Sequence, residues 1–376
     1  MSIRTPIAAL KLALACAAGT AAFAVAAPTP QELAIAAGYK AQFTCSATFN
    51  AGKPEALIAA QELSHYGDHL NEAMALVGDA VIDQQARRVS VRYNDALPPR
   101  ISAWREYLGC TGLPQGADAA AIKHLPTLRL RKPSTDLPQR PWPSGDALPP
   151  GTRTPALDAV FEDAFSGSFG GVTSAVLVAE GELLRGERYA PGYTMHTSQR
   201  TWSVAKSLAA TVLGAAVQQR LIKVDAPTGL QAWQRPGDPR RNITLANLLH
   251  MSSGLDNRPA GNRTDNVYFG GGLVAQHATK NALNAAPGSL WSYANNDTML
   301  AMRALRERMK NDRRYLAFPF KALLHPIGMF HTHPETDWDG DFVMSSQVWT
   351  TSRDLARLGL LYLNDGVWNG KRILPK

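Results

Sequence analysis

The sequence predicts an α+β fold, because two alternating strand segments are followed by a series of segments with helical spacing. The strand segments, 172–178 and 183–189, flank the turn Glu180-Gly181 and predict a β-hairpin. Helical spacing is found in the segments 156–165, 203–219, 245–251, 297–310, 317–324 and 352–364. Because a two-stranded hairpin is at best marginally stable alone in water, we expect further strands to complete this sheet. The sequence shows no second run of strands before it ends at Lys376.

The composition is that of a soluble globular protein with two domains, or with one large domain and an appendage. The chain has 376 residues, of which 45% are hydrophobic and 19% are charged. These values exclude a disordered chain and a polytopic membrane protein. The formal net charge is +8, but the basic residues are scattered and form no run. Nucleic acid is therefore not an expected partner.

Residues 1–26 have the pattern of a secretory signal peptide. Arg4 and Lys11 precede an apolar stretch, 12–25, that closes in the small-residue pattern Ala-Val-Ala. About 14 apolar residues are too few for a membrane-spanning helix, which needs about 20. We expect cleavage after Ala26 and a periplasmic or secreted protein that keeps no stable membrane anchor.

Two cysteines remain after the leader, and they predict a disulfide between Cys45 and Cys110. Chains exported to an oxidising compartment form such bonds readily. Two buried free thiols are the less favoured alternative. Cys16 belongs to the leader, and its position inside the apolar stretch makes a lipoprotein cysteine the less favoured interpretation.

The exported chain divides into three regions. Residues 27–131 mix helical and strand patterns, such as the alternation at 89–93, and predict an N-terminal module held by the disulfide. Residues 132–155 are rich in proline, which predicts a linker without regular structure. The hairpin and most of the helical segments then fall in a domain of residues 156–376.

Ser203 and Lys206 form a Ser-x-x-Lys motif at the start of an apolar segment. Residues three apart on a helix share a face, so the Lys206 amine can reach the Ser203 hydroxyl. Val204 to Val217 is almost entirely apolar or small, which predicts a buried helix with these two polar exceptions at its start. The alternative is that Ser203 is only an N-cap. A lysine in the first turn opposes the helix dipole, so Lys206 does not fit a capping role.

A second polar motif follows in 287–296, where a Pro-Gly turn leads into Tyr293-Ala294-Asn295 directly before a predicted helix. Tyr293 offers a phenol or phenolate for proton transfer, and Asn295 offers an amide for a substrate carbonyl. The alternative for Asn295 is an N-cap of the following helix, and the sequence favours neither interpretation.

These motifs, taken in order, resemble the serine β-lactamase and penicillin-binding-protein superfamily. The similarity is greatest to its class C branch, which includes esterases and 6-aminohexanoate-dimer hydrolases. The segments that carry the resemblance are Ser203-x-x-Lys206, Leu248-Leu249-His250-Met251-Ser252-Ser253-Gly254-Leu255, Trp291-Ser292-Tyr293-Ala294-Asn295, Pro326-Ile327-Gly328-Met329 and 352–366.

The resemblance implies a β-lactamase-like fold, in which helices flank an antiparallel sheet beside a helical subdomain. It implies that Ser203 attacks a carbonyl with help from Lys206 and Tyr293, that Asn295 binds substrate, and that no cofactor is needed. Substrates would be small amides or esters. A β-lactamase, a D-alanyl-peptidase and a non-catalytic relative that binds cell-wall peptides are the alternatives.

The family's late strand carries Lys-Thr-Gly or a His-x-Gly-like variant, and no such motif follows Tyr293. We therefore expect the final sheet strands to be missing from this chain. The segment His331-Thr332-His333-Pro334-Glu335 and the nearby Asp337, Asp339 and Asp341 contain metal-ligating residue types. Pro334 and the spacing of tryptophan and glycine in this segment favour a polar surface loop, and we expect no metal site.

Overall fold

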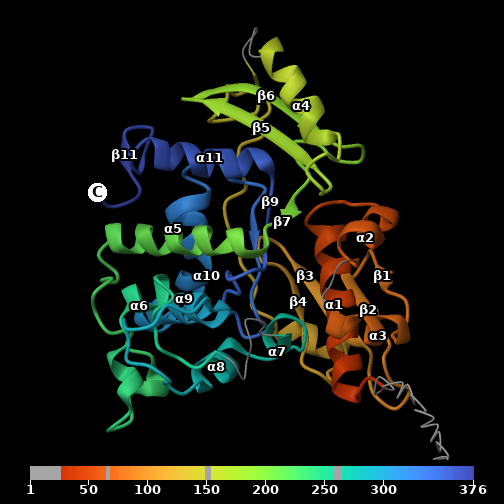
Figure 1. The fold of residues 1–376 in the computed structure, drawn as a ribbon, viewed down its shortest axis with the longest axis vertical. Coiled ribbons are helices and arrows are strands. Elements are labelled where there is room, and N and C mark those ends of the chain that lie inside the picture. The colour runs from red at the N-terminus through yellow and green to blue at the C-terminus, as the bar shows by residue number, and fades with distance from the viewer. Residues whose placement is uncertain (1–26, 65–67, 149–153, 258–264) are drawn as a thin grey trace, which may run out of the picture.

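The computed structural model describes residues 27–64, 68–148, 154–257 and 265–376. The predicted signal peptide, 1–26, lies outside these residues. Figure 1 shows the N-terminal helices and their sheet on the right, a hairpin with one helix at the top, and a group of helices on the left. No helix in the described residues has the length and apolar character needed to cross a membrane.

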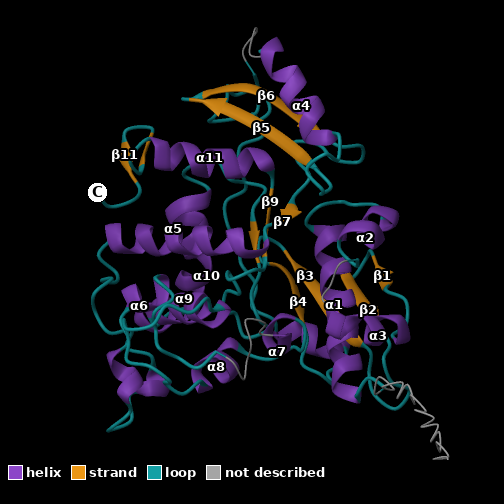
Figure 2. Ribbon diagram, in the orientation of Figure 1, coloured by secondary structure: helices purple, strands orange, loops and turns teal. Residues whose placement is uncertain are grey.

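The N-terminal part packs a buried helix against a four-stranded antiparallel sheet (Figure 2). Its elements are α1 (Pro30–Phe49), α2 (Glu55–Gln61), α3 (Asp68–Leu76), β1 (Val81–Asp83), β2 (Arg88–Val91), β3 (Arg100–Arg105) and β4 (Gly109–Gly112). Thr29 and Glu32 form a capping box at the start of α1. Gly38 lets this helix approach the next region closely, because a Cβ there would lie 1.9 Å from the carbonyl oxygen of Phe269.

The predicted disulfide is confirmed: Cys45 on α1 is bonded to Cys110 on β4, 65 residues later. Both cysteines are fully buried. The bond therefore joins the central helix of the N-terminal part to the last strand of its sheet.

Removing this disulfide should lower the free energy of unfolding by about 2–4 kcal/mol, because the unfolded chain gains conformational entropy. The double variant Cys45→Ala/Cys110→Ala is the one to compare with the parent in urea unfolding. A variant as stable as the parent would contradict the expectation.

Residues 132–148 contain turns and one isolated bridge, with no helix or strand, as the prolines predict. A short 3-10 turn (Pro155–Leu157) and α4 (Asp158–Phe165) follow. The predicted hairpin is present as β5 (Ala175–Glu180) and β6 (Leu183–Tyr189). It lies between α4 and helix α11 (Ser352–Leu363) in Figure 1. Within the described residues, no third strand pairs with it.

Except for 156–165, which forms α4 beside the hairpin, the helical segments that the sequence predicts lie in the group of helices. Its elements are β7 (Gln199–Arg200), α5 (Ala205–Gln218), α6 (Leu245–Leu249), α7 (Asp265–Tyr268), α8 (Val274–His277), α9 (Asn295–Met309), α10 (Asp312–Pro319), β8 (His333–Pro334), β9 (Val348–Thr350), α11, β10 (Val367–Trp368) and β11 (Lys371–Arg372). A π-helical turn, Phe320–Leu324, continues α10. The strands β7, β9 and β8 form a small antiparallel sheet in that order.

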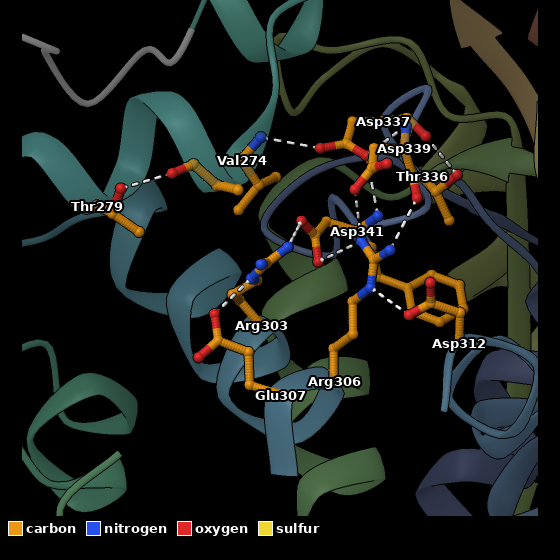
Figure 3. A network of polar contacts seen from close by, with 12 residues as sticks. Val274, Thr279, Arg303, Arg306, Glu307, Asp312, Thr336, Asp337, Asp339 and Asp341 are labelled. Carbon is orange, nitrogen blue, oxygen red and sulfur yellow. Dashed lines mark hydrogen bonds and ion pairs between the residues drawn. The ribbon is translucent and has the colours of Figure 1, made fainter. Parts of the chain in front are cut away.

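The segment 331–341 is not the polar surface loop that its sequence predicts. Asp341 is 1% exposed and lies between two arginines of α9. Its oxygens are 2.6 Å from Arg303 Nη1 and 3.1 Å from Arg306 Nη1 (Figure 3). Asp337 accepts hydrogen bonds from the backbone N–H groups of Val274 and Asp341. Burial is possible because arginines and backbone donors from other segments compensate these carboxylates.

Candidate active site

Ser203 and Lys206 lie where the chain enters α5. Ser203 is exposed in a short 3-10 turn, and Lys206 is half-buried in the first turn of the helix. The Lys206 ammonium donates a hydrogen bond to Ser203 Oγ at 3.2 Å. Leu208, Ala209 and Val212 of α5 are fully buried, so the apolar part of the helix anchors these two polar residues. This is the arrangement that the Ser-x-x-Lys spacing predicts.

Tyr293 completes a compact polar group with Ser203 and Lys206. It precedes α9, and its hydroxyl lies 2.6 Å from Ser203 Oγ. Burial alone would raise the pKa of Tyr293. Its hydrogen bonds with Ser203 and Lys206, together with the Lys206 charge, instead lower that pKa below its usual value. Tyr293 is therefore positioned to exchange a proton with the Ser203 hydroxyl.

Two further acceptors hold Lys206. Its Nζ donates to Asn295 Oδ1 at 2.8 Å and to the carbonyl oxygen of Ser345 at 2.7 Å. Burial lowers the pKa of Lys206, whereas the interaction with Tyr293 raises it, and the net shift is downward. Asn295 is thus part of the polar group as well as the first residue of α9. Ser345 was not a candidate in the sequence, since a backbone carbonyl has no residue-type signature.

The segment 251–254 supports the loop that carries Tyr293. The carbonyl oxygen of Met251 accepts a hydrogen bond from the Ser292 N–H, and Ser253 Oγ donates to the buried Asp297 of α9 at 3.0 Å. Gly254 has a φ of 76°, and a Cβ there would lie 2.3 Å from the Ala285 carbonyl oxygen. Only glycine combines this conformation with such close contact.

The N-terminal helix α1 reaches the residues that precede Ser203. The guanidinium carbon of Arg200 lies 3.8 Å from the ring centroids of both Phe43 on α1 and Trp202. Arg200 Nε is also 3.5 Å from a carboxylate oxygen of Glu62. Trp202 has a φ of 46°, a strained conformation for a bulky residue. The stacking of Phe43, Arg200 and Trp202 therefore holds Trp202 in its strained conformation directly before Ser203.

The sequence of residues 161–375 matches the family model described as Beta-lactamase. The chain belongs to the β-lactamase family. The matched region contains Ser203, Lys206, Tyr293 and Asn295, and it leaves the N-terminal helices and their sheet outside. No curated protein matches this β-lactamase-family chain significantly.

Solved structures resemble the chain over little more than half its length. One, from Bacillus anthracis and assigned as a 6-aminohexanoate-dimer hydrolase, has 22% identity and a TM-score of 0.47, and the match covers 58% of this chain and 59% of that one. One from Bacteroides dorei, assigned as a β-lactamase, has 22% identity, coverages of 58% and 66%, and a TM-score of 0.48. A penicillin-binding protein from Bacillus halodurans has 14% identity, coverages of 58% and 76%, and a TM-score of 0.45. The chain thus spans about three-fifths to two-thirds of the first two proteins.

Proposed function

We propose that this protein is a periplasmic or secreted serine hydrolase that cleaves small amides or esters through an acyl-enzyme on Ser203. The observation that carries the proposal is the contact of one exposed hydroxyl with both an amine and a phenol. Ser203 Oγ is 3.2 Å from Lys206 Nζ and 2.6 Å from Tyr293 Oη. A serine hydroxyl becomes a useful nucleophile when a positioned base removes its proton.

The contacts of Lys206 support Tyr293 as that base. Lys206 Nζ has three acceptors, the oxygens of Ser203, Asn295 and Ser345, and an ammonium group has three hydrogens to donate. These three hydrogen bonds favour the charged form of Lys206 and oppose the effect of burial, which lowers its pKa overall. A positive charge beside Tyr293 stabilises the phenolate, which is the form that accepts the serine proton.

The reaction proceeds in two steps. Ser203 Oγ bonds to the substrate carbonyl carbon as its proton passes to Tyr293, and the resulting oxyanion accepts a hydrogen bond from the Ser203 N–H. The bond to the leaving group then breaks, and the departing amine or alcohol takes the proton from Tyr293. Water attacks the acyl ester by the same route and releases the acid and free Ser203. The Asn295 amide nitrogen donates to a carbonyl oxygen elsewhere in the substrate.

Labelling with a fluorophosphonate probe tests the proposal directly. The purified protein should gain one adduct, and peptide mass spectrometry should locate it on Ser203. Ser203→Ala should abolish labelling. Ser207→Ala, which changes an exposed serine four residues later, in the first turn of α5, should leave labelling intact. Labelling that persists in Ser203→Ala would exclude this site, and an unlabelled parent would favour a non-catalytic relative that binds cell-wall peptides.

A further inference from the structure

Three metal-ligating side chains meet beside α11, and none of them belongs to the Ser203 site. They are Asp146 in the proline-rich segment, His196 before β7 and His331 before β8. One potential ligand atom from each lies within 4.8 Å of those of the other two. The two imidazole rings are 4.8 Å apart between centroids. All three residues line a cavity of about 310 Å³.

The rings of His196 and His331 contact each other in the described part of the chain, at 4.8 Å between centroids. Neither ring forms a hydrogen bond or an ion pair with another described residue. Two imidazoles that face each other cannot both be charged without repulsion, whereas two neutral imidazoles offer lone pairs to a shared cation. The unpaired ring nitrogens are therefore available to bind a cation.

Two arginines hold Asp146 in an orientation that still allows its carboxylate to bind a cation. Arg357 Nη2 binds its Oδ1 at 2.9 Å, and Arg353 Nη1 binds its backbone carbonyl oxygen at 2.8 Å. Such outer contacts are common for metal-bound carboxylates, because they fix the orientation of the ligand. The Arg357 contact at 2.9 Å and the Arg353 ion-pair contact at 3.5 Å both involve Oδ1 of the carboxylate.

Both arginines are neutralised by other acids, so they do not exclude a cation. Arg353 pairs with Glu187 through Nη2 at 2.5 Å, and Arg357 pairs with Asp354 through Nη1 at 3.0 Å. The two arginines carry two positive charges and Glu187, Asp354 and Asp146 carry three negative charges, which leaves one net negative charge next to the two histidines. This net negative charge attracts a divalent cation.

The backbone around His331 is fixed on both sides. Its N–H donates to Asp354 Oδ2 at 2.9 Å, and its carbonyl oxygen accepts from Ser198 Oγ at 2.8 Å. His196, in contrast, is exposed, so its ring is free to turn towards a bound ion. His331 and Asp146 are held in place, and rotation of the His196 ring can bring its nitrogen closer to them. The three ligand atoms can then reach the spacing that a tetrahedrally coordinated ion requires.

We propose that Asp146, His196 and His331 bind a divalent transition-metal ion, with Zn²⁺ as the best match. Two imidazole nitrogens and one carboxylate oxygen are a frequent zinc ligand set, and the adjoining cavity leaves room for water at the fourth position. The bound ion ties the proline-rich segment to the loops before β7 and β8. This differs from the sequence expectation, which assigned the chain no metal, because the three ligands come from segments far apart in sequence.

Equilibrium dialysis of metal-free protein against Zn²⁺ tests the proposal. The parent should bind one equivalent, and both His196→Ala and His331→Ala should weaken binding at least tenfold. Zn²⁺ should also raise the thermal unfolding temperature of the parent but not of either variant, since a ligand stabilises only the state that binds it. Because Asp146 also anchors α11, the histidine variants carry the test. Their melting without metal should match that of the parent.

His124→Ala is the matched control, because His124 is an exposed histidine at the end of a 3-10 turn. It should bind Zn²⁺ like the parent. The proposal is overturned if the parent binds less than one equivalent of Zn²⁺, or if His196→Ala and His331→Ala both bind Zn²⁺ with the affinity of the parent.

Discussion

Replacing Lys206 with methionine should slow the acylation of Ser203 by about 10²–10⁴-fold, the range typical of a lost acid–base contribution. Methionine has an unbranched apolar side chain like the methylene chain of Lys206, but it lacks the ammonium group and the three hydrogen bonds of that group. Stopped-flow acylation with an activated ester such as p-nitrophenyl acetate measures the rate, and the kcat of the same reaction should fall in parallel.

The pH profile distinguishes this electrostatic role from a loss of structure. Contact with Ser203 and Lys206 lowers the pKa of Tyr293 below its usual value, despite the opposing effect of burial. The acylation rate of the parent should therefore rise as pH increases through this lowered pKa. Without the Lys206 charge, the pKa of Tyr293 returns towards its ordinary value of about 10, so the rising limb should move to higher pH.

Two further variants complete this experiment. Tyr293→Phe keeps the ring and removes the hydroxyl, so it should be similarly slow and should lose the rising limb. Lys223→Met removes an exposed lysine outside the group and should behave like the parent. If Lys206→Met slows acylation but leaves the pH profile of the parent unchanged, Lys206 acts only through structure.

The sequence was sufficient where the signal is local. The hairpin β5–β6, the helices α4, α5, α6, α9 and α11, and the Ser203–Lys206 pair follow from periodicity and one-turn spacing, which depend on neighbours a few residues apart. Tyr293 and Asn295 lie about 90 residues further along the chain, and their link to Ser203 came from the family resemblance, not from spacing.

Long-range partners were beyond the reach of the sequence. Ser345 contributes a backbone carbonyl, which any residue could supply. Arg200 acts through Phe43 and Glu62, which belong to the N-terminal part that the family model does not match. Nothing in the sequence pattern of any of these residues indicates the partner that it meets.

The largest error concerned segment 331–341, where Pro334 and the spacing of tryptophan and glycine predicted a polar surface loop. The burial of an ionised side chain depends on its partners, and the donors for Glu335 lie more than 200 residues earlier in the chain. The residue types of a segment indicate that burying its acidic side chains is costly. They do not show the distant donors whose hydrogen bonds offset that cost.

Replacing Glu335 with alanine should lower the free energy of unfolding by about 3–5 kcal/mol. Its carboxylate accepts four hydrogen bonds from the N-terminal part, from Gln42 Nε2 at 3.0 Å, Ser46 Oγ at 2.6 Å, Asn50 Nδ2 at 2.9 Å and the Cys110 N–H at 3.0 Å. Alanine leaves these donors without a partner, at a cost of about 1 kcal/mol or more for each. Urea unfolding measures the loss, and a change below about 1 kcal/mol would contradict this account.

Glu335→Gln separates the hydrogen bonds from the charge. Glutamine keeps an acceptor oxygen for three of the donors but never ionises. Burial raises the pKa of Glu335 to about 7, against the lowering effect of its hydrogen bonds, from an ordinary value of 4.5. The folded state therefore binds the proton more tightly than the unfolded state, and the stabilisation from protonation is complete below pH 4.5. As pH rises towards 7, the parent should lose about 3 kcal/mol relative to Glu335→Gln. A stability difference that is independent of pH would show that Glu335 titrates alike in both states, and that its hydrogen bonds compensate burial fully.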